Sequence, residues 1–109
     1  MTNFVFISRH APTEAQCQLA SKAGVVLHHF GDIDAFDDLA SHNKLHGYKR
    51  EGFAGIVCVH PVIALLAYQA GLVVGVFQNI NRAAAGDPLR FECGMFKLFT
   101  PHSEATFTP

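Results

Sequence analysis

The stretch GIVCVHPVIALLAYQAGLVVGVF, residues 55–77, decides how the chain folds. It is apolar over about the 20 residues that a membrane-spanning helix needs. His60-Pro61 and Gly71 interrupt it, however, and proline suits the first turn of a helix whereas glycine suits its C-terminal end. The stretch therefore predicts a buried strand, a short helix and a second buried strand rather than a membrane span.

The same alternation of buried strand and helix fills the chain before this stretch. Phe4–Ile7 is a short, continuous apolar run, typical of a strand covered on both faces. Thr13 and Gln16 have capping-box spacing at the start of a helix, and Gly24 follows its last turn. We expect strands at Phe4–Ile7, Val25–Phe30, Ile56–Val59 and Leu72–Phe77, and helices at Thr13–Ala23, Asp34–His46 and Pro61–Ala70, with Gly47 ending the second helix.

Short strand–helix units of this kind predict an α/β fold, a small Rossmann-like domain with a mostly parallel sheet and flanking helices. After the turn at residues 85–88, apolar Leu89, Phe91 and Cys93 alternate with charged residues, and the parity slips near Gly94. This pattern predicts a C-terminal antiparallel edge strand with a bulge. We therefore expect one domain over residues 1–100 and a tail over residues 101–109.

Composition favours an oligomer. The 109 residues are 50% hydrophobic and 16% charged, more apolar material than a small globule easily hides. The helix Pro61–Ala70 is apolar nearly all round, so one side is expected to meet the sheet and the other a second subunit of a homodimer, unless the C-terminal strand or tail covers it. The net charge of -1 argues against duplex nucleic acid as a partner.

Cysteine usage and the N-terminus indicate a cytoplasmic protein. Cys17, Cys58 and Cys93 are odd in number and lack CxxC spacing, so neither a disulfide framework nor a zinc site is indicated. The first residues lack the basic region and cleavage site of a secretory signal. No cofactor motif is present either, because GxGxxG, Walker lysine and serine-elbow sequences are missing.

Polar segments at the ends of the predicted strands mark the candidate site, since ligands of open parallel sheets bind beyond the carboxyl ends of the strands. Helix N-termini there favour phosphate, and Arg9 could add a bidentate clamp. His10 and His60 each follow a buried strand directly, and functional and structural roles remain equally open for both. Asp32 and Asp34 are interpreted as a turn and a helix cap rather than as magnesium ligands. The four segments are Ser8-Arg9-His10, Gly31–Asp34, His60-Pro61 and the loop Gln78–Arg82.

Two parts of the chain together resemble a known family. Phe6–His10 with the helix opening at Pro12-Thr13, and the strand-His60-Pro61-helix unit with its following strand, are similar to small CRISPR-associated ring nucleases and cyclic-oligoadenylate-binding accessory proteins. These are short Rossmann-like dimers, related to CARF sensor domains, that act on cyclic tetra-adenylate. The likeness runs from about Phe4 to Arg90 through short motifs.

The resemblance implies a function in antiviral defence. A homodimer would bind cyclic tetra-adenylate in a cleft across its two-fold axis and cleave it without a metal, which switches off type III CRISPR signalling. A ribose 2′-hydroxyl would attack the adjacent phosphodiester and leave a 2′,3′-cyclic phosphate. Arg9, His10 and His60 are the catalytic candidates. The ligand-binding candidates are Ser8, Pro12, Thr13, Pro61, Gln78, Asn79, Asn81 and Arg82.

Three alternatives remain open. A non-catalytic protein could sequester the ring without cutting it. Arg9-His10 and the later strand-His60-helix also resemble histidine phosphatases, although Ala11 stands where their RHG motif has glycine and no second arginine and acid pair is evident between the two histidines. An unrelated small α/β binding protein is the third alternative.

Overall fold

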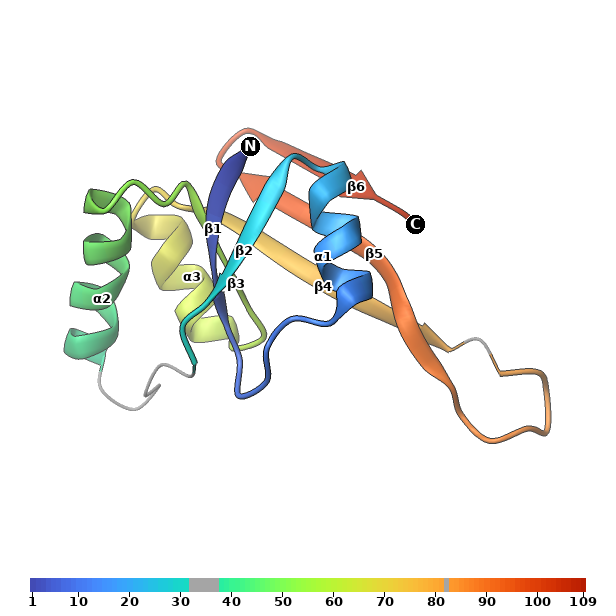
Figure 1. The fold of residues 1–109 in the computed structure, drawn as a ribbon. Helices are drawn as coiled ribbons and strands as arrows, with labels where there is room; N and C mark the ends of the chain where they lie inside the picture. The colour runs from blue at the N-terminus through green and yellow to red at the C-terminus, as the bar shows by residue number, and fades with distance from the viewer. Residues whose placement is uncertain (32–37, 82) are drawn as a thin grey trace.

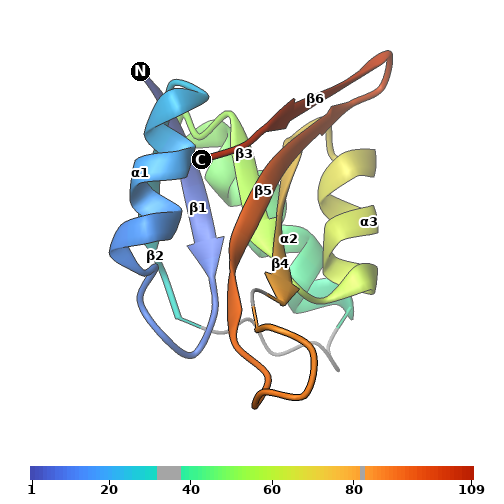
Figure 2. The same ribbon diagram turned by 90° about the vertical axis from the view of Figure 1, so that its right-hand side faces the viewer.

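The computed structural model describes residues 1–31, 38–81 and 83–109, which form a six-stranded sheet with helices on both faces (Figure 1). Figure 2 shows α1 on one face of the sheet and α2 and α3 on the other. The elements are β1 (Thr2–Ile7), α1 (Glu14–Lys22), β2 (Val25–His29), α2 (Asp38–Arg50), β3 (Gly55–Cys58), α3 (Pro61–Gln69), β4 (Val73–Asn81), β5 (Phe91–Thr100) and β6 (Ser103–Phe107).

The first four strands make the parallel half of the sheet. The strand order is β2-β1-β3-β4-β5-β6, and β1 is parallel to both β2 and β3, which in turn is parallel to β4. Residues Phe4–Ile7 of β1 and all of β3 are buried, as the continuous apolar runs predicted for strands that are covered on both faces.

The prediction of a mostly parallel, Rossmann-like sheet with one antiparallel edge strand is wrong. β5 lies inside the sheet and is antiparallel to both β4 and β6, so the sheet is mixed and β6 forms its edge. Only the short turn between Thr100 and Ser103 joins β5 to β6, and a parallel crossover needs a dozen or so residues. β6 also lies within the segment that we expected as a tail, and its short, mostly exposed sequence SEATF gave little strand signal.

The predicted bulge near Gly94 is present. Gln78 of β4 lies beside Met95 of β5, whereas the next residue, Asn79, lies beside Cys93, which leaves Gly94 as the extra residue. A Cβ on this buried glycine would stand 2.6 Å from the Ile80 side chain, so the glycine allows close packing. The bulge sets the register that places Cys93 next to Asn79.

Each face of the sheet has its own core. On the α2 and α3 side, Leu45 and Ile63 pack against strand residues such as Ile56. On the α1 side, Leu19 packs in a cluster around Phe96, whose ring is fully buried and stacks on Phe77 at 4.4 Å between centroids. Leu19 and Ala20 are the buried residues of α1.

The start of α1 follows a local sequence signal, whereas the end of α2 depends on a tertiary contact. The Thr13–Gln16 capping box of α1 is confirmed, with both reciprocal hydrogen bonds formed. α2, by contrast, runs through Gly47 to Arg50, and Gly52 at φ +97° ends it in a Schellman motif in which Phe53 N–H donates to the Tyr48 carbonyl. The Phe53 and Tyr48 rings also pack together, 6.2 Å apart, which favours this later end. Asp34, the predicted cap of this helix, lies outside the described residues.

The apolar stretch 55–77 is divided as predicted into β3, α3 and the start of β4. Pro61 opens α3, and Gly71 at φ +87° ends it, again in a Schellman motif with Leu72 N–H on the Ala67 carbonyl. In the described part of the chain, no helix has the length and apolarity that crossing a bilayer requires.

Candidate functional site

The chain reverses its direction of winding between β1 and β3, and this point locates the candidate site. β1 and β3 are parallel neighbours, with Ile7 beside Cys58 at their carboxyl ends. From β1 the chain passes through α1 to β2 on one side, and from β3 it passes through α3 to β4 on the other side. α1 and α3 lie on opposite faces of the sheet (Figure 2). The two loops therefore diverge, and in parallel sheets such a point is where ligands bind.

The loop after β1 is held at both ends. The Ser8 N–H donates to the Gly31 carbonyl at 3.1 Å, and the Ser8 carbonyl lies 2.7 Å from Nε2 of His29. At the other end, Thr13 forms the capping box of α1. Arg9 and His10 lie between these anchors with exposed side chains, so the loop presents a guanidinium and an imidazole at the carboxyl end of β1.

The loop after β3 is held by His60. Its Nδ1 accepts a hydrogen bond from the Ile63 N–H at 3.4 Å, which makes His60 the N-cap of α3, and Pro61 occupies the first helical position. The Cys58 thiol donates to the His60 carbonyl at 3.6 Å, and burial raises the pKa of this thiol. His60 therefore has a structural role in the loop that also places it at the carboxyl end of β3.

The segment after Phe77 is strand, not the loop that we predicted. Residues 78–81 continue β4 because β5 supplies a hydrogen-bonding partner along them. Alternation in β4 puts Asn79 on the α1 face with Phe77, and Gln78 on the opposite face. The Asn81 Oδ1 accepts from the N–H groups of Ala83 and Arg90 and so closes the base of the hairpin. The remaining candidate of this segment, Arg82, lies outside the described residues.

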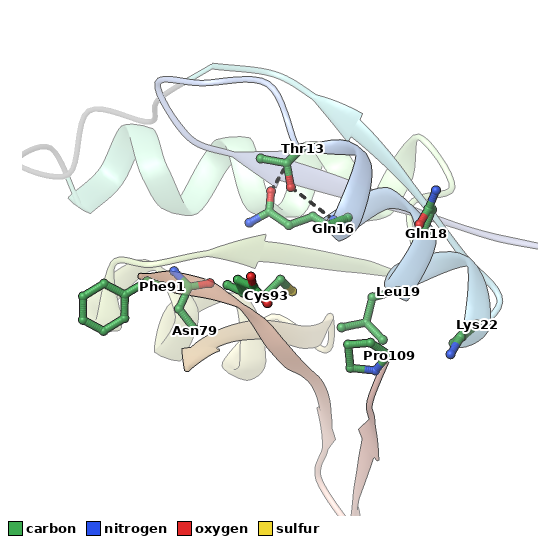
Figure 3. A pocket seen from close by; sticks show the side chains of 11 residues that line it. Thr13, Gln16, Gln18, Leu19, Lys22, Asn79, Phe91, Cys93 and Pro109 are labelled. Atoms are coloured by element: carbon green, nitrogen blue, oxygen red, sulfur yellow. Dashed lines mark hydrogen bonds between the residues drawn. The ribbon is translucent and has the colours of Figure 1, made fainter. Parts of the chain in front are cut away.

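Two adjoining cavities lie at this end of the sheet. A small one, of about 120 Å³, sits at the switch point between the ends of β1 and β3, beside Ser8 and Val59. A larger one, of about 710 Å³, runs between α1 and the strands β4 and β5, and we call it the trough (Figure 3). Gln16 and Asn79 line both cavities, so these two amides mark the passage from one to the other.

Most of the predicted residues therefore lie at one edge of the sheet, but only some of them line a cavity. Ser8, Thr13 and Asn79 line the cavities, whereas Arg9, His10, His60 and Pro61 lie on the surrounding loops and do not line either one. Pro12 is half-buried between Arg9 and the cap of α1. Gln78 points to the other face and Asn81 braces the hairpin.

Sequence reasoning missed the trough residues Gln16, Leu19, Phe91 and Cys93. Gln16 carried a signal only as a partner in the capping box, and Cys93 appeared as a core residue of an edge strand. Their proximity depends on β5 lying inside the sheet, which no local pattern indicated.

Asp32 and Asp34, which we interpreted as a turn and a helix cap rather than as magnesium ligands, lie outside the described residues. Among the described side chains, those of residues 1–31, 43–81 and 83–109, no group of three His, Cys, Asp or Glu is arranged to hold a metal ion.

Comparisons with protein-family models, with curated proteins and with solved structures gave no match for this chain.

Proposed function

We propose that the protein binds cyclic tetra-adenylate across the two-fold axis of a homodimer and cleaves it in the cytoplasm without a metal ion. The observation that carries this proposal is the position of the loop Ser8–Thr13. It holds Arg9 and His10 exposed at the switch point, next to two cavities that together could hold a nucleotide. Loops at such a point, beside helix N-termini, are where parallel sheets bind phosphorylated ligands.

Arg9 is the phosphate-binding group in this proposal. Its guanidinium can pair with a phosphodiester through two N–H groups, and the Ser8 hydroxyl lies on the same loop. The Ser8 Oγ already accepts from the His10 N–H at 3.3 Å, which leaves its own hydrogen free to donate to a phosphate oxygen. The anchored loop would therefore hold one phosphodiester of the ring in a fixed orientation.

His10 is the proposed general base. It takes the proton of the ribose 2′-hydroxyl as the oxygen attacks phosphorus and the bond to the 5′-oxygen breaks. The departing 5′-oxygen takes a proton from solvent water, and His10 then returns its own proton to solvent. The products are a 2′,3′-cyclic phosphate and a 5′-hydroxyl. His60 is poorly suited to this task, because its Nδ1 already accepts from Ile63 N–H and a neutral ring then carries its hydrogen on Nε2. Its Nε2–H can instead donate to a phosphate oxygen.

An exposed apolar face of α3 supports the homodimer. The exposed fractions of Val62 and Leu65 are 49% and 57%, whereas Ile63 and Ala67 face the core. β6 does not cover this face, because it pairs with β5 and its Phe107 packs with the α1-side core. Val59, 93% exposed, lines the switch-point cavity two residues before α3 begins. Two copies paired there would bring both sets of loops toward a ring of four identical nucleotides.

The test is incubation with cyclic tri-, tetra- and hexa-adenylate in EDTA, followed by chromatography and mass spectrometry. We expect linear products with a 2′,3′-cyclic phosphate from the tetra-adenylate. Tight binding without products would instead identify a sequestering protein, and covalent phosphate on His10 would identify a phosphatase. Absence of binding to all three rings would overturn the proposal.

A further inference from the structure

The trough is too large to be a packing defect and lies in the range of small-molecule sites, which are commonly about 300–1,000 Å³. It exists because α1 packs on the sheet through Leu19 and Ala20, while the strands β4 and β5 continue beyond this contact. Cys93, placed on this face by the bulge, and Asn79 leave the space between helix and strands unfilled.

Three polar residues of the trough, Thr13, Gln16 and Asn79, lie at the end that adjoins the switch point (Figure 3). The Thr13 N–H donates to Oε1 of Gln16 at 3.0 Å, which fixes this amide and leaves its Nε2 hydrogens to donate elsewhere. Figure 3 shows this nitrogen turned away from Thr13, on the side of Asn79. Within the described part of the chain, the Asn79 amide has no hydrogen-bonding partner, so it offers both a donor and an acceptor.

The charges differ between the trough and the switch-point loop. Among the described residues that line the trough, the side chains expected to be charged at neutral pH are those of Lys22 and Glu92, one of each sign. Lys22 Nζ already donates to the Thr108 carbonyl, and Glu92 pairs with Arg90 at 3.5 Å. The trough therefore suits a neutral group, whereas the loop with Arg9 suits a phosphate.

We propose that the trough is a purine-base subsite, in which the Asn79 amide pairs with the amino and ring-nitrogen edge of an adenine whose phosphate lies at the Ser8–Arg9 loop. Asparagine matches adenine because its amide oxygen accepts from N6 while its nitrogen donates to N7. Leu19 and Cys93 border the space that the flat ring would occupy, and Gln16 Nε2 can donate to a further ring nitrogen. Phe91, 61% exposed at the end beyond Asn79, is available to stack on the base (Figure 3).

The adenine assignment rests on the proposed function, because its ligand class comes from there. The experiment therefore uses ligands that test the adenine subsite and ring binding separately. Calorimetry is done with 5′-AMP, 5′-UMP and cyclic tetra-adenylate on the wild type, on Asn79→Ala and on the matched control Asn43→Ala, which changes an exposed asparagine of α2. We expect 5′-AMP to bind at least tenfold more tightly than 5′-UMP. Asn79→Ala should weaken both adenine ligands roughly tenfold, since one bidentate amide–base pair is worth about 1–3 kcal/mol. Asn43→Ala should match the wild type.

A second readout avoids any dependence on the folding of the variant. Cys93 lines the trough, so saturating 5′-AMP should slow its alkylation by iodoacetamide in the wild type several-fold and leave that of exposed Cys17 unchanged. The subsite is overturned if 5′-AMP neither binds nor protects Cys93, or if Asn79→Ala binds the adenine ligands within twofold of the wild type. If Asn79→Ala binds cyclic tetra-adenylate as tightly as the wild type does, the subsite is wrong but the proposed function stands. Adenine-selective 5′-AMP binding without ring binding would preserve the subsite alone.

Discussion

The imidazole of His60 accepts a hydrogen bond at Nδ1 from the backbone N–H of Ile63, 3.4 Å away, and thereby caps α3. The same residue ends the connection from β3, so one side chain both starts a helix and borders the candidate site. Its cap role and any chemical role can be separated, because asparagine also caps helices well but does not transfer protons.

Replacing His60 should therefore affect stability more than chemistry. His60→Ala is expected to lower the free energy of unfolding by about 1 kcal/mol, the usual effect of losing an N-cap, whereas His60→Asn should restore most of it. Denaturant unfolding measures both.

Single-turnover cleavage by His60→Asn should stay within tenfold of the wild-type rate, whereas His10→Asn should lower it by about 10²–10⁴-fold, as for a lost general base. The opposite ranking would make His60 the base.

Arg9→Ala should weaken both ring binding and cleavage. A guanidinium at this loop pairs with the phosphodiester in the ground state as well as in the transition state, so its loss raises Kd and lowers the rate together. The matched control is Arg50→Ala, at the exposed end of α2. A normal Kd in Arg9→Ala, measured by calorimetry, would place the phosphate elsewhere.

Cleavage should persist in EDTA at the rate seen without it. In the proposed mechanism the attacking group is the ribose 2′-hydroxyl, and Arg9 supplies the positive charge that a metal would otherwise provide. Time courses with EDTA and with added magnesium or manganese measure this. Strict dependence on a divalent ion, removed by Asp32→Asn, would contradict the mechanism.

Leu65→Glu should convert a dimer into a monomer. Leu65 lies on the exposed face of α3. In a two-fold interface the substitution would bury two carboxylates, one from each subunit, in apolar surroundings, and the loss of their hydration opposes association. Leu66, by contrast, packs against the core, so a charge there would also damage the fold. Leu89→Glu is the matched control, since Leu89 is 71% exposed outside this face. Light scattering should give a dimer mass for the wild type and the control; a monomeric wild type would exclude this interface.

Cysteine alkylation should depend on pH in a residue-specific way. Burial raises the pKa of the Cys93 and Cys58 thiols, and only the thiolate reacts. At neutral pH both should therefore react more slowly than an unperturbed thiol, and their rates should still be rising at pH values where an unperturbed thiol has levelled off. Mass spectrometry of iodoacetamide-treated protein from pH 7 to 10 measures this. Cys93 with the pH profile of a free thiol would show that the trough does not desolvate it.

Local signals in the sequence were sufficient for most helices and strands of the parallel half, but not for the end of α2 or the last residues of β4. The capping box at Thr13 and Gln16, and the pair Pro61 and Gly71 around α3, act within a few residues of the chain. A short, continuous apolar run such as Phe4–Ile7 is typical of a strand buried on both faces, and these residues are buried in β1. These features therefore appear in the sequence as they appear in the structure.

The antiparallel half depended on pairing between distant segments. Gln78 and Asn79 are polar and gave no strand signal, yet they lie in β4 because β5 offers hydrogen bonds to their backbone. Similarly, residues 103–107 become β6 only because β5 lies beside them. Backbone hydrogen bonds are independent of side-chain type, so periodicity revealed β5 and its bulge but neither the last residues of β4 nor β6.

The sequence by itself determined which loops would carry the candidate residues, because alternating strands and helices place Ser8–His10 and His60-Pro61 at the same edge of a sheet. Only the tertiary structure decided the shape of the site. Gln16 and Cys93 are far apart in the chain and line one trough because β5 crosses beneath α1 inside the sheet. The physical reason is that a cavity forms where packed elements fail to fill space, and this depends on their relative placement rather than on any local pattern.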